Sequence, residues 1–127
     1  MLKSNKRPVF LNLLQIKLPL TAIASILHRI AGLLMIVSLP LLIYLFEMSL
    51  REEASFLQMI DLLEQPLVSL LMYLLLWAIA HHFLAGIRYF LVDFEWLAGR
   101  QASRLSAGVV VMAGISIPLL VFTGRLL

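Results

Sequence analysis

The stretch HHFLAGIRYFLVDF, residues 81–94, ends a long apolar run that carries no formal charge from Pro66 to Ile87. Two histidines and Arg88 therefore lie where an apolar helix approaches the aqueous boundary of a membrane. Ionisable groups at that depth are costly to desolvate, so they mark a functional site with a binding partner. The stretch predicts both a membrane-spanning helix and a site near its end.

The composition of the whole chain indicates an integral membrane protein. Of its 127 residues, 62% are hydrophobic and only 13% are charged, about half the charged fraction of an ordinary soluble domain. The net charge of +3 does not indicate nucleic-acid binding, because the ten basic residues are scattered among the ends of apolar runs. The absence of cysteine excludes disulfides, thiolate catalysis and thiolate-bound iron–sulfur clusters within these residues.

Three apolar segments are predicted to cross the membrane as helices, over about residues 21–46, 66–92 and 104–125. The predicted fold class is an all-α integral membrane protein, with one membrane-anchor domain over residues 1–127. Its three helices run up, down and up. The sequence shows no repeat and no soluble domain boundary.

The segments between the helices carry their own signals. Thr21 is expected to cap the first helix near its start. Pro40 and Pro118 are expected to bend the first and third spanning helices without ending them. Residues 47–65 are acidic on balance, and their apolar side chains recur at helical spacing from Phe56 to Leu63, which predicts a short interfacial helix.

The basic residues predict the topology. Residues 1–20 form a basic, surface-lying arm, and Arg100 and Arg104 lie in the loop before the third span. By the positive-inside rule, the N-terminus and this loop face the cytoplasm, while the acidic loop faces the other side. Arg125 falls on the acidic side and is the exception.

His82 is the histidine best suited to bind a cofactor. The small residues Ala78, Ala85 and Gly86 lie one turn before and after it on the helix. A flat macrocycle could approach the backbone there, with the imidazole as an axial iron ligand. The same pattern is typical of a helix-packing seam in which His82 hydrogen-bonds across the interface, and periodicity does not choose between the two. His81, about a quarter turn away, is expected to face a partner or a polar cavity.

Three polar residues share neighbouring parts of one face on the first helix: Ser25, His28 and Arg29. A hydroxyl beside a permanent cation could hold a carbonyl oxygen of a membrane-dissolved ligand, or a haem propionate. Alternatively, Arg29 reaches lipid phosphate and Ser25 bonds back to its own helix. Arg88 meets a propionate or anchors its helix at the headgroups.

Two stretches resemble the cytochrome b membrane-anchor subunit of succinate dehydrogenase, respiratory complex II. They are RPVFLNLLQIKLPLTAIASILHRIAG, residues 7–32, and HHFLAGIRYFLVD, residues 81–93. The shared pattern is an arm beginning Arg-Pro, then Ser-Ile-x-His-Arg-x-x-Gly, then His-x-x-x-Gly-Ile-Arg followed by an aspartate. The third helix adds little identity to the resemblance.

The resemblance implies an anchor that pairs with a second three-helix anchor subunit and holds one haem b between a histidine from each. An iron–sulfur subunit and a flavoprotein would dock on the cytoplasmic face of the bacterial inner membrane, and electrons from succinate would reach ubiquinone or menaquinone. His82 matches the family's haem ligand, and Ser25 and Arg29 match its quinone-binding pair. His28 and Arg29 match positions near the haem propionates, and Arg88 is expected in the same vicinity.

The chain departs from the family pattern at two places. Ala31 stands where many relatives have serine or threonine, and Tyr89 stands where histidine is frequent. The resemblance implies that the isolated chain carries no succinate-oxidising site and contributes to the enzyme as a non-flavin subunit. Two alternatives are the anchor of a fumarate reductase and a small haem-free membrane scaffold or transporter. The transporter would be expected to show matched broken helices or internal repeats.

Overall fold

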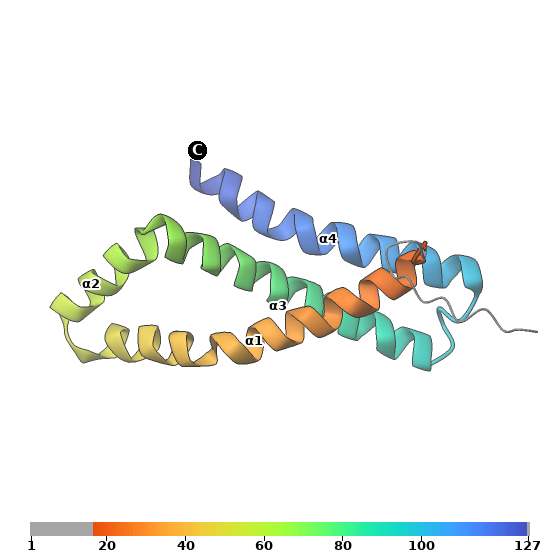
Figure 1. Cartoon of the computed structure of the whole chain (residues 1–127), viewed down its shortest axis with the longest axis horizontal. Coiled ribbons are helices and arrows are strands. Elements are labelled where there is room, and N and C mark those ends of the chain that lie inside the picture. Colours follow the sequence, from red (N-terminus) through yellow and green to blue (C-terminus); the bar gives the residue numbers. More distant parts are fainter. Residues whose placement is uncertain (1–16, 127) are drawn as a thin grey trace, which may run out of the picture.

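A computed structural model describes residues 17–126, which fold into three long helices and one short one (Figure 1). The long helices are α1 (Leu20–Arg51), α3 (Pro66–Asp93) and α4 (Arg100–Leu126), and α2 (Glu53–Glu64) is the short helix between α1 and α3. All three long helices are long and apolar enough to cross a membrane. The predicted all-α membrane fold is therefore confirmed, and each helix extends beyond the apolar segment predicted from the sequence.

The start of α1 differs from the prediction. The helix begins at Leu20, one residue before Thr21, so the expected side-chain cap at Thr21 is wrong. The carbonyl oxygen of Pro19 instead accepts hydrogen bonds from the backbone N–H groups of Ala22 and Ile23, at 2.9 and 3.2 Å. The extended backbone of Pro19 makes it the N-cap residue. Most of the predicted basic arm lies outside the described residues.

Small side chains form the contact between the long helices. The fully buried apolar residues include five alanines, and small residues let membrane helices approach closely. Many large apolar side chains point outward instead, and Ile36, Phe83 and Leu120 are each 64–69% exposed. This inside-out distribution suits a chain whose outer surface meets lipid or another apolar helix. The buried alanines are Ala24, Ala31, Ala78, Ala85 and Ala107.

The short helix α2 occupies the far end of the molecule, where it contacts α1 and α3 (Figure 1). Its Met59 is buried with Leu45 and Met48 of α1 in a separate apolar cluster. The helix predicted within residues 47–65 is therefore present. Pro40 lies inside α1 and Pro118 inside α4, so neither proline ends its helix.

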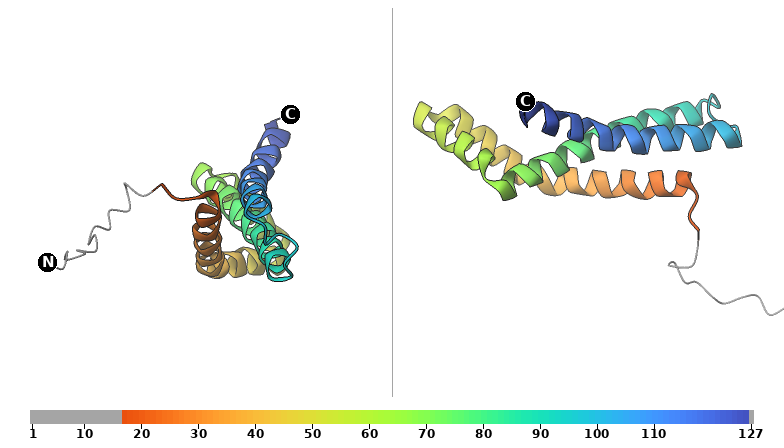
Figure 2. Two further views of the ribbon diagram at one scale, coloured as in Figure 1. Left: turned by 90° about the vertical axis from the view of Figure 1, so that its right-hand side faces the viewer. Right: turned by 90° about the horizontal axis from the view of Figure 1, so that it is seen from above.

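The helices run in alternating directions, and α3 contacts both α1 and α4 (Figures 1 and 2). The start of α1 lies beside the first turns of α4, with Leu20 Cδ1 3.9 Å from the position a Cβ would take at Gly108. The C-terminal end of α3 lies at the same end of the molecule as the first turns of α1 and α4 (Figure 1). The predicted site residues of α1 and α3 therefore lie in the half of the molecule where α4 begins.

Candidate functional site

The two histidines of α3 lie in different surroundings. His81 is fully buried, and Ala78 and Ala85 on the same stripe are 0% and 1% exposed. The small-residue seam predicted around His82 is therefore occupied by His81. The expectation that His81 faces a partner or a polar cavity is wrong, because α1 and α4 close over this stripe of α3 within the chain itself.

The packing around His81 is tight. A Cβ added at Gly114 of α4 would lie 2.9 Å from His81 Nδ1 and 3.1 Å from His81 Cβ. The Trp77 ring stacks on the imidazole, with ring centroids 5.6 Å apart and planes inclined by 16°. Among the described residues, neither ring nitrogen of His81 has a hydrogen-bond partner. His81 thus serves as a packing residue at the α3–α4 contact, which depends on glycine at position 114.

His82 faces α1. Its ring stacks on that of His28, with centroids 4.1 Å apart and an interplanar angle of 16°. His82 Nδ1 lies 3.2 Å from the backbone carbonyl oxygen of His28. Gly32 leaves room for the ring, because a Cβ there would lie 3.1 Å from His82 Cε1. The structure therefore brings His82 of α3 against the predicted site face of α1.

The setting of His82 fits an axial haem ligand. When Nδ1–H donates to the His28 carbonyl, Nε2 keeps the lone pair that binds iron, and ligating histidines commonly have this second hydrogen bond. One turn later, Gly86 has nothing within 4 Å of its would-be Cβ, so a flat group meets no side chain there. His28 stacks face to face on His82 and so cannot be the ligand on the opposite side of the same iron. Of the two stacked rings, His82 is therefore the one whose surroundings suit an axial ligand.

A polar face of α1 flanks this histidine pair. Ser25, His28, Arg29 and Gly32 follow the i, i+3, i+4, i+7 spacing of one helix face. Ser25 is half-buried and Arg29 is exposed. Within residues 17–126, the Ser25 hydroxyl makes no hydrogen bond back to its helix, contrary to the alternative considered above. A hydroxyl and a guanidinium are thus available on one face to a carbonyl oxygen or a carboxylate.

Arg88 lies apart from this face. It is 5% exposed, and its Nη2 donates to the hydroxyl and the carbonyl oxygen of Ser103 at 2.9 and 3.1 Å. Its Nε donates to the Ser106 hydroxyl at 3.1 Å. In the described part of the chain, no carboxylate lies within ion-pair distance of this guanidinium. Arg88 therefore binds α4, in place of the anchoring at lipid headgroups considered above.

Tyr89 links Arg88 to the histidine pair. Its ring meets the His28 ring edge-on, with centroids 5.2 Å apart, and Arg88 Cζ lies 5.6 Å from the Tyr89 ring centroid. Sequence reasoning treated Tyr89 only as a departure from the family pattern. The signal that could have placed it was its spacing, since residues seven apart lie on the same helix face. Tyr89 therefore belongs to the site.

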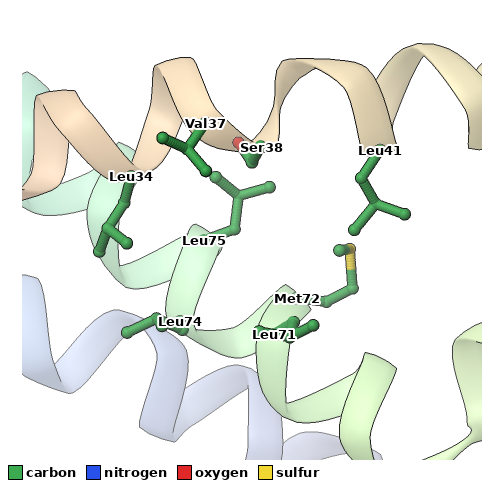
Figure 3. Close-up of a pocket in the computed structure, with 8 residues that line it drawn as sticks. All are labelled: Leu34, Val37, Ser38, Leu41, Leu71, Met72, Leu74 and Leu75. Atoms are coloured by element: carbon green, nitrogen blue, oxygen red, sulfur yellow. The ribbon is translucent and has the colours of Figure 1, made fainter.

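A separate apolar pocket of about 210 Å³ lies between α1 and α3, farther toward α2 (Figure 3). Ser38 is its one polar lining residue, and its hydroxyl is already bonded to the Met35 carbonyl oxygen at 2.8 Å. None of its lining residues is ionisable, and the histidines lie outside it. Its lining residues are Leu34, Val37, Ser38, Leu41, Leu71, Met72, Leu74 and Leu75.

Comparison with known proteins identifies a family and a curated relative. Residues 3–122 match the family described as succinate dehydrogenase/fumarate reductase transmembrane subunit. The chain is also similar to the succinate dehydrogenase cytochrome b556 subunit of Coxiella burnetii (strain RSA 493 / Nine Mile phase I). The two are 34% identical over 106 residues, which cover 83% of this chain and 85% of the relative. The family match extends over α1, α3 and most of α4, beyond the two stretches noted in the sequence.

Proposed function

Because the chain belongs to the succinate dehydrogenase/fumarate reductase transmembrane subunit family, we propose that it is the cytochrome b anchor of a succinate:quinone oxidoreductase. The name of the Coxiella relative supports the cytochrome assignment. The three candidate spans and the apolar outer surface support the anchoring role. The chain contains no cysteine, so iron–sulfur clusters bound by thiolates would belong to another subunit.

His82 is the proposed axial ligand of a haem b, and the second ligand would come from a second three-helix anchor subunit. When bound, the haem supplies a one-electron carrier at the membrane boundary. The observation that carries this assignment is the approach of His82 Nδ1 to the His28 carbonyl oxygen at 3.2 Å. That bond would fix the tautomer and aim Nε2 away from α1. Gly32 and the stacked His28 ring would hold the imidazole in place.

The haem propionates would lie near His28, Arg29 and Arg88. Arg29 is exposed beside the histidine pair and offers a guanidinium that suits a carboxylate. Arg88 would act from behind Tyr89, held in position by α4. Its positive charge, with no carboxylate partner among residues 17–126, would favour an anion nearby.

Ser25 and Arg29 are the proposed donors to the quinone. A quinone carbonyl oxygen gains negative charge on reduction, and a fixed cation with a neighbouring hydroxyl stabilises that charge. Both side chains lie on the α1 face that carries His28, so quinone and haem would be neighbours. The substrate is a membrane quinone, ubiquinone or menaquinone.

The proposed setting is the bacterial inner membrane, with the N-terminus and the Arg100 and Arg104 region on the cytoplasmic side. An iron–sulfur subunit and a flavoprotein would bind on that side. The flavoprotein would oxidise succinate, and the present chain would complete electron transfer to quinone. A fumarate reductase anchor is the nearest rival, because the family description includes both enzymes.

The decisive experiment is a dithionite-reduced minus oxidised absorption spectrum of the purified complex. We expect a b-type haem band in the wild type and its loss in His82→Ala. The matched control is His81→Leu, which removes the adjacent, buried imidazole; the complex that assembles with it should keep the band, although its stability is lower. A haem band that persists in an assembled His82→Ala complex would overturn the ligand assignment. Relative rates of succinate oxidation and fumarate reduction with the same quinone pool distinguish the two enzymes.

A further inference from the structure

A basic hollow opens between the start of α1 and the start of α4, and Ser103, a hydrogen-bond partner of Arg88, is one of its lining residues. Its volume is about 430 Å³, and its polar lining consists of Thr21, Ser103, Arg100 and Arg104. Both arginines are exposed, and they are four residues apart on α4, so they lie on one helix face. The hydroxyl of Ser103 accepts a hydrogen bond from Arg88 at 2.9 Å, which places a third positive charge behind the hollow.

The charge of this hollow is not neutralised by the described residues. Only two ion pairs occur among them, Arg51 with Glu47 and Arg125 with Glu64, and both lie away from the hollow. Asp93 and Glu95, although near in sequence, lie beyond ion-pair distance of both arginines. The hollow therefore favours an anion with several acceptor oxygens.

An apolar groove continues from the basic hollow along α4. A middle hollow lies between the two: it shares Arg100 and Arg104 with the basic hollow, and Leu20, Arg104 and Leu105 with the groove, so the three spaces are neighbours. The groove has a volume of about 520 Å³ and is lined farther down by Gly108, Val109 and Met112. Gly108 deepens it by lacking a side chain. A ligand that fills all three spaces needs a charged head and a long apolar tail.

From this adjacency of a basic hollow and an apolar groove we propose a binding site for an anionic phospholipid. Arg100 and Arg104, with the hydroxyls of Thr21 and Ser103, hold the phosphate, and an acyl chain lies in the groove along α4. The start of α4 is at the edge of its membrane span, which is the depth at which a lipid phosphate lies. A free anion would use the head region alone and leave the groove without an occupant.

Lipid retention in the purified, delipidated complex tests the head region. Native mass spectrometry would compare phosphatidylglycerol with phosphatidylcholine of the same acyl chains. We expect the wild type to retain phosphatidylglycerol preferentially, and Arg100→Gln with Arg104→Gln to weaken that retention about fivefold per arginine. Arg51→Gln, which removes an exposed arginine at the opposite end of α1, should leave it unchanged. If the double variant fails to assemble, Arg100→Gln and Arg104→Gln are measured separately, and each should weaken the retention of phosphatidylglycerol about fivefold.

A second substitution tests the tail region. Val109 is 66% exposed, so Val109→Trp fills the groove without disturbing the helix contacts. It should lower the retention of both lipids by a similar factor, whereas Leu119→Trp, at an exposed position outside the groove, should not. An unchanged lipid population in Val109→Trp would overturn the tail assignment.

Three other results would overturn the site. An undiminished preference for phosphatidylglycerol in the arginine variants would show that the lipid binds elsewhere. Displacement of the lipid by inorganic phosphate would show a simple anion site. Loss of the iron–sulfur subunit from the arginine variants, with lipid retention unchanged, would assign Arg100 and Arg104 to subunit docking.

Discussion

Two adjacent histidines on α3 belong to regions of opposite character. The region around His81 is sealed by alanines and by Gly114, and its imidazole has no hydrogen-bond partner among the described residues. The region around His82 has a hydrogen bond to α1 and open space over Gly86. One helical step of about 100° separates them. In this three-helix bundle, the neighbouring helices therefore decide which histidine packs and which is available to a ligand.

The difference also separates the expected consequences of mutation. Changes in the sealed region should alter stability and assembly, because its side chains are buried between helices of the chain. Changes on the α1 side should alter cofactor or quinone chemistry while the bundle stays folded. Each of the following predictions tests this separation.

The largest effect should come from the sealed region. Gly114→Val places a branched side chain where even a Cβ would lie 2.9 Å from His81 Nδ1, so α3 and α4 must move apart. We expect a loss of about 3 kcal/mol in stability, measured as a lower melting temperature and yield of the complex. Gly124→Val is the control, since nothing lies within 4 Å of that glycine. An equally stable Gly114→Val complex would contradict the close α3–α4 contact.

On the α1 face, substitutions should affect the rate of quinone reduction, by an amount of similar size in free energy. Arg29→Leu or Ser25→Ala should slow quinone reduction by roughly 100-fold, because one donor to the reduced oxygen is lost. Succinate oxidation with an artificial acceptor should be unchanged. Ser38→Ala, a serine on the same helix away from this face, is the control. Equal loss of both activities would indicate failed assembly and would remove the distinction between the two regions.

Substitution of Arg88 tests whether this residue holds α3 to α4, as the sealed region around His81 does. Arg88→Gln removes charged hydrogen bonds to Ser103 and Ser106, and we expect it to lower stability by about 2 kcal/mol. Ser106→Ala should give part of this effect, while Ser116→Ala, whose hydroxyl bonds only to Met112, should give none. Thermal unfolding of the complex provides the measurement. Stability that did not differ among these variants would mean that Arg88 does not hold α3 to α4.

The smallest effect should be at Gly32. A Cβ there would lie 3.1 Å from His82 Cε1, so Gly32→Ala must displace the ring by a few tenths of an ångström, at a cost of about 1 kcal/mol. We expect haem binding to weaken roughly fivefold, measured by haem loss to apomyoglobin. Gly108→Ala, where the nearest atom is 3.9 Å away, should bind haem as the wild type does. Stronger haem binding in Gly32→Ala would contradict the proposed orientation of His82.

Much of the architecture could be predicted from the sequence. The apolar runs predicted three spanning helices, and apolar spacing predicted the short helix between the first two, because helix formation in lipid depends mainly on local hydropathy. The start of α1 was predicted wrongly, because the Pro19 carbonyl accepts the first helical bonds that Thr21 was expected to organise. Such an end effect depends on the backbone conformation at Pro19, which residue preferences do not specify.

The candidate site was predicted less completely. Spacing placed Ser25, His28 and Arg29 on one face, as the structure has them. It did not predict that Arg88 turns to Ser103 and Ser106, because these partners lie on another helix. The spacing also did not predict that His81 packs against α4 whereas His82 faces α1. The roles of the site residues in haem and quinone binding stay predictions.

The sequence by itself determined that this chain is a three-span helical membrane protein and which of its residues carry ionisable groups near the ends of the spans. It did so because hydropathy and helical period are properties of a single segment. Only the tertiary structure decided that His81 is sealed against Gly114 while His82 meets His28 and Gly32. The physical reason is that periodicity gives the angle of a side chain about its own helix, whereas packing decides which neighbouring helix lies at that angle and how close it comes.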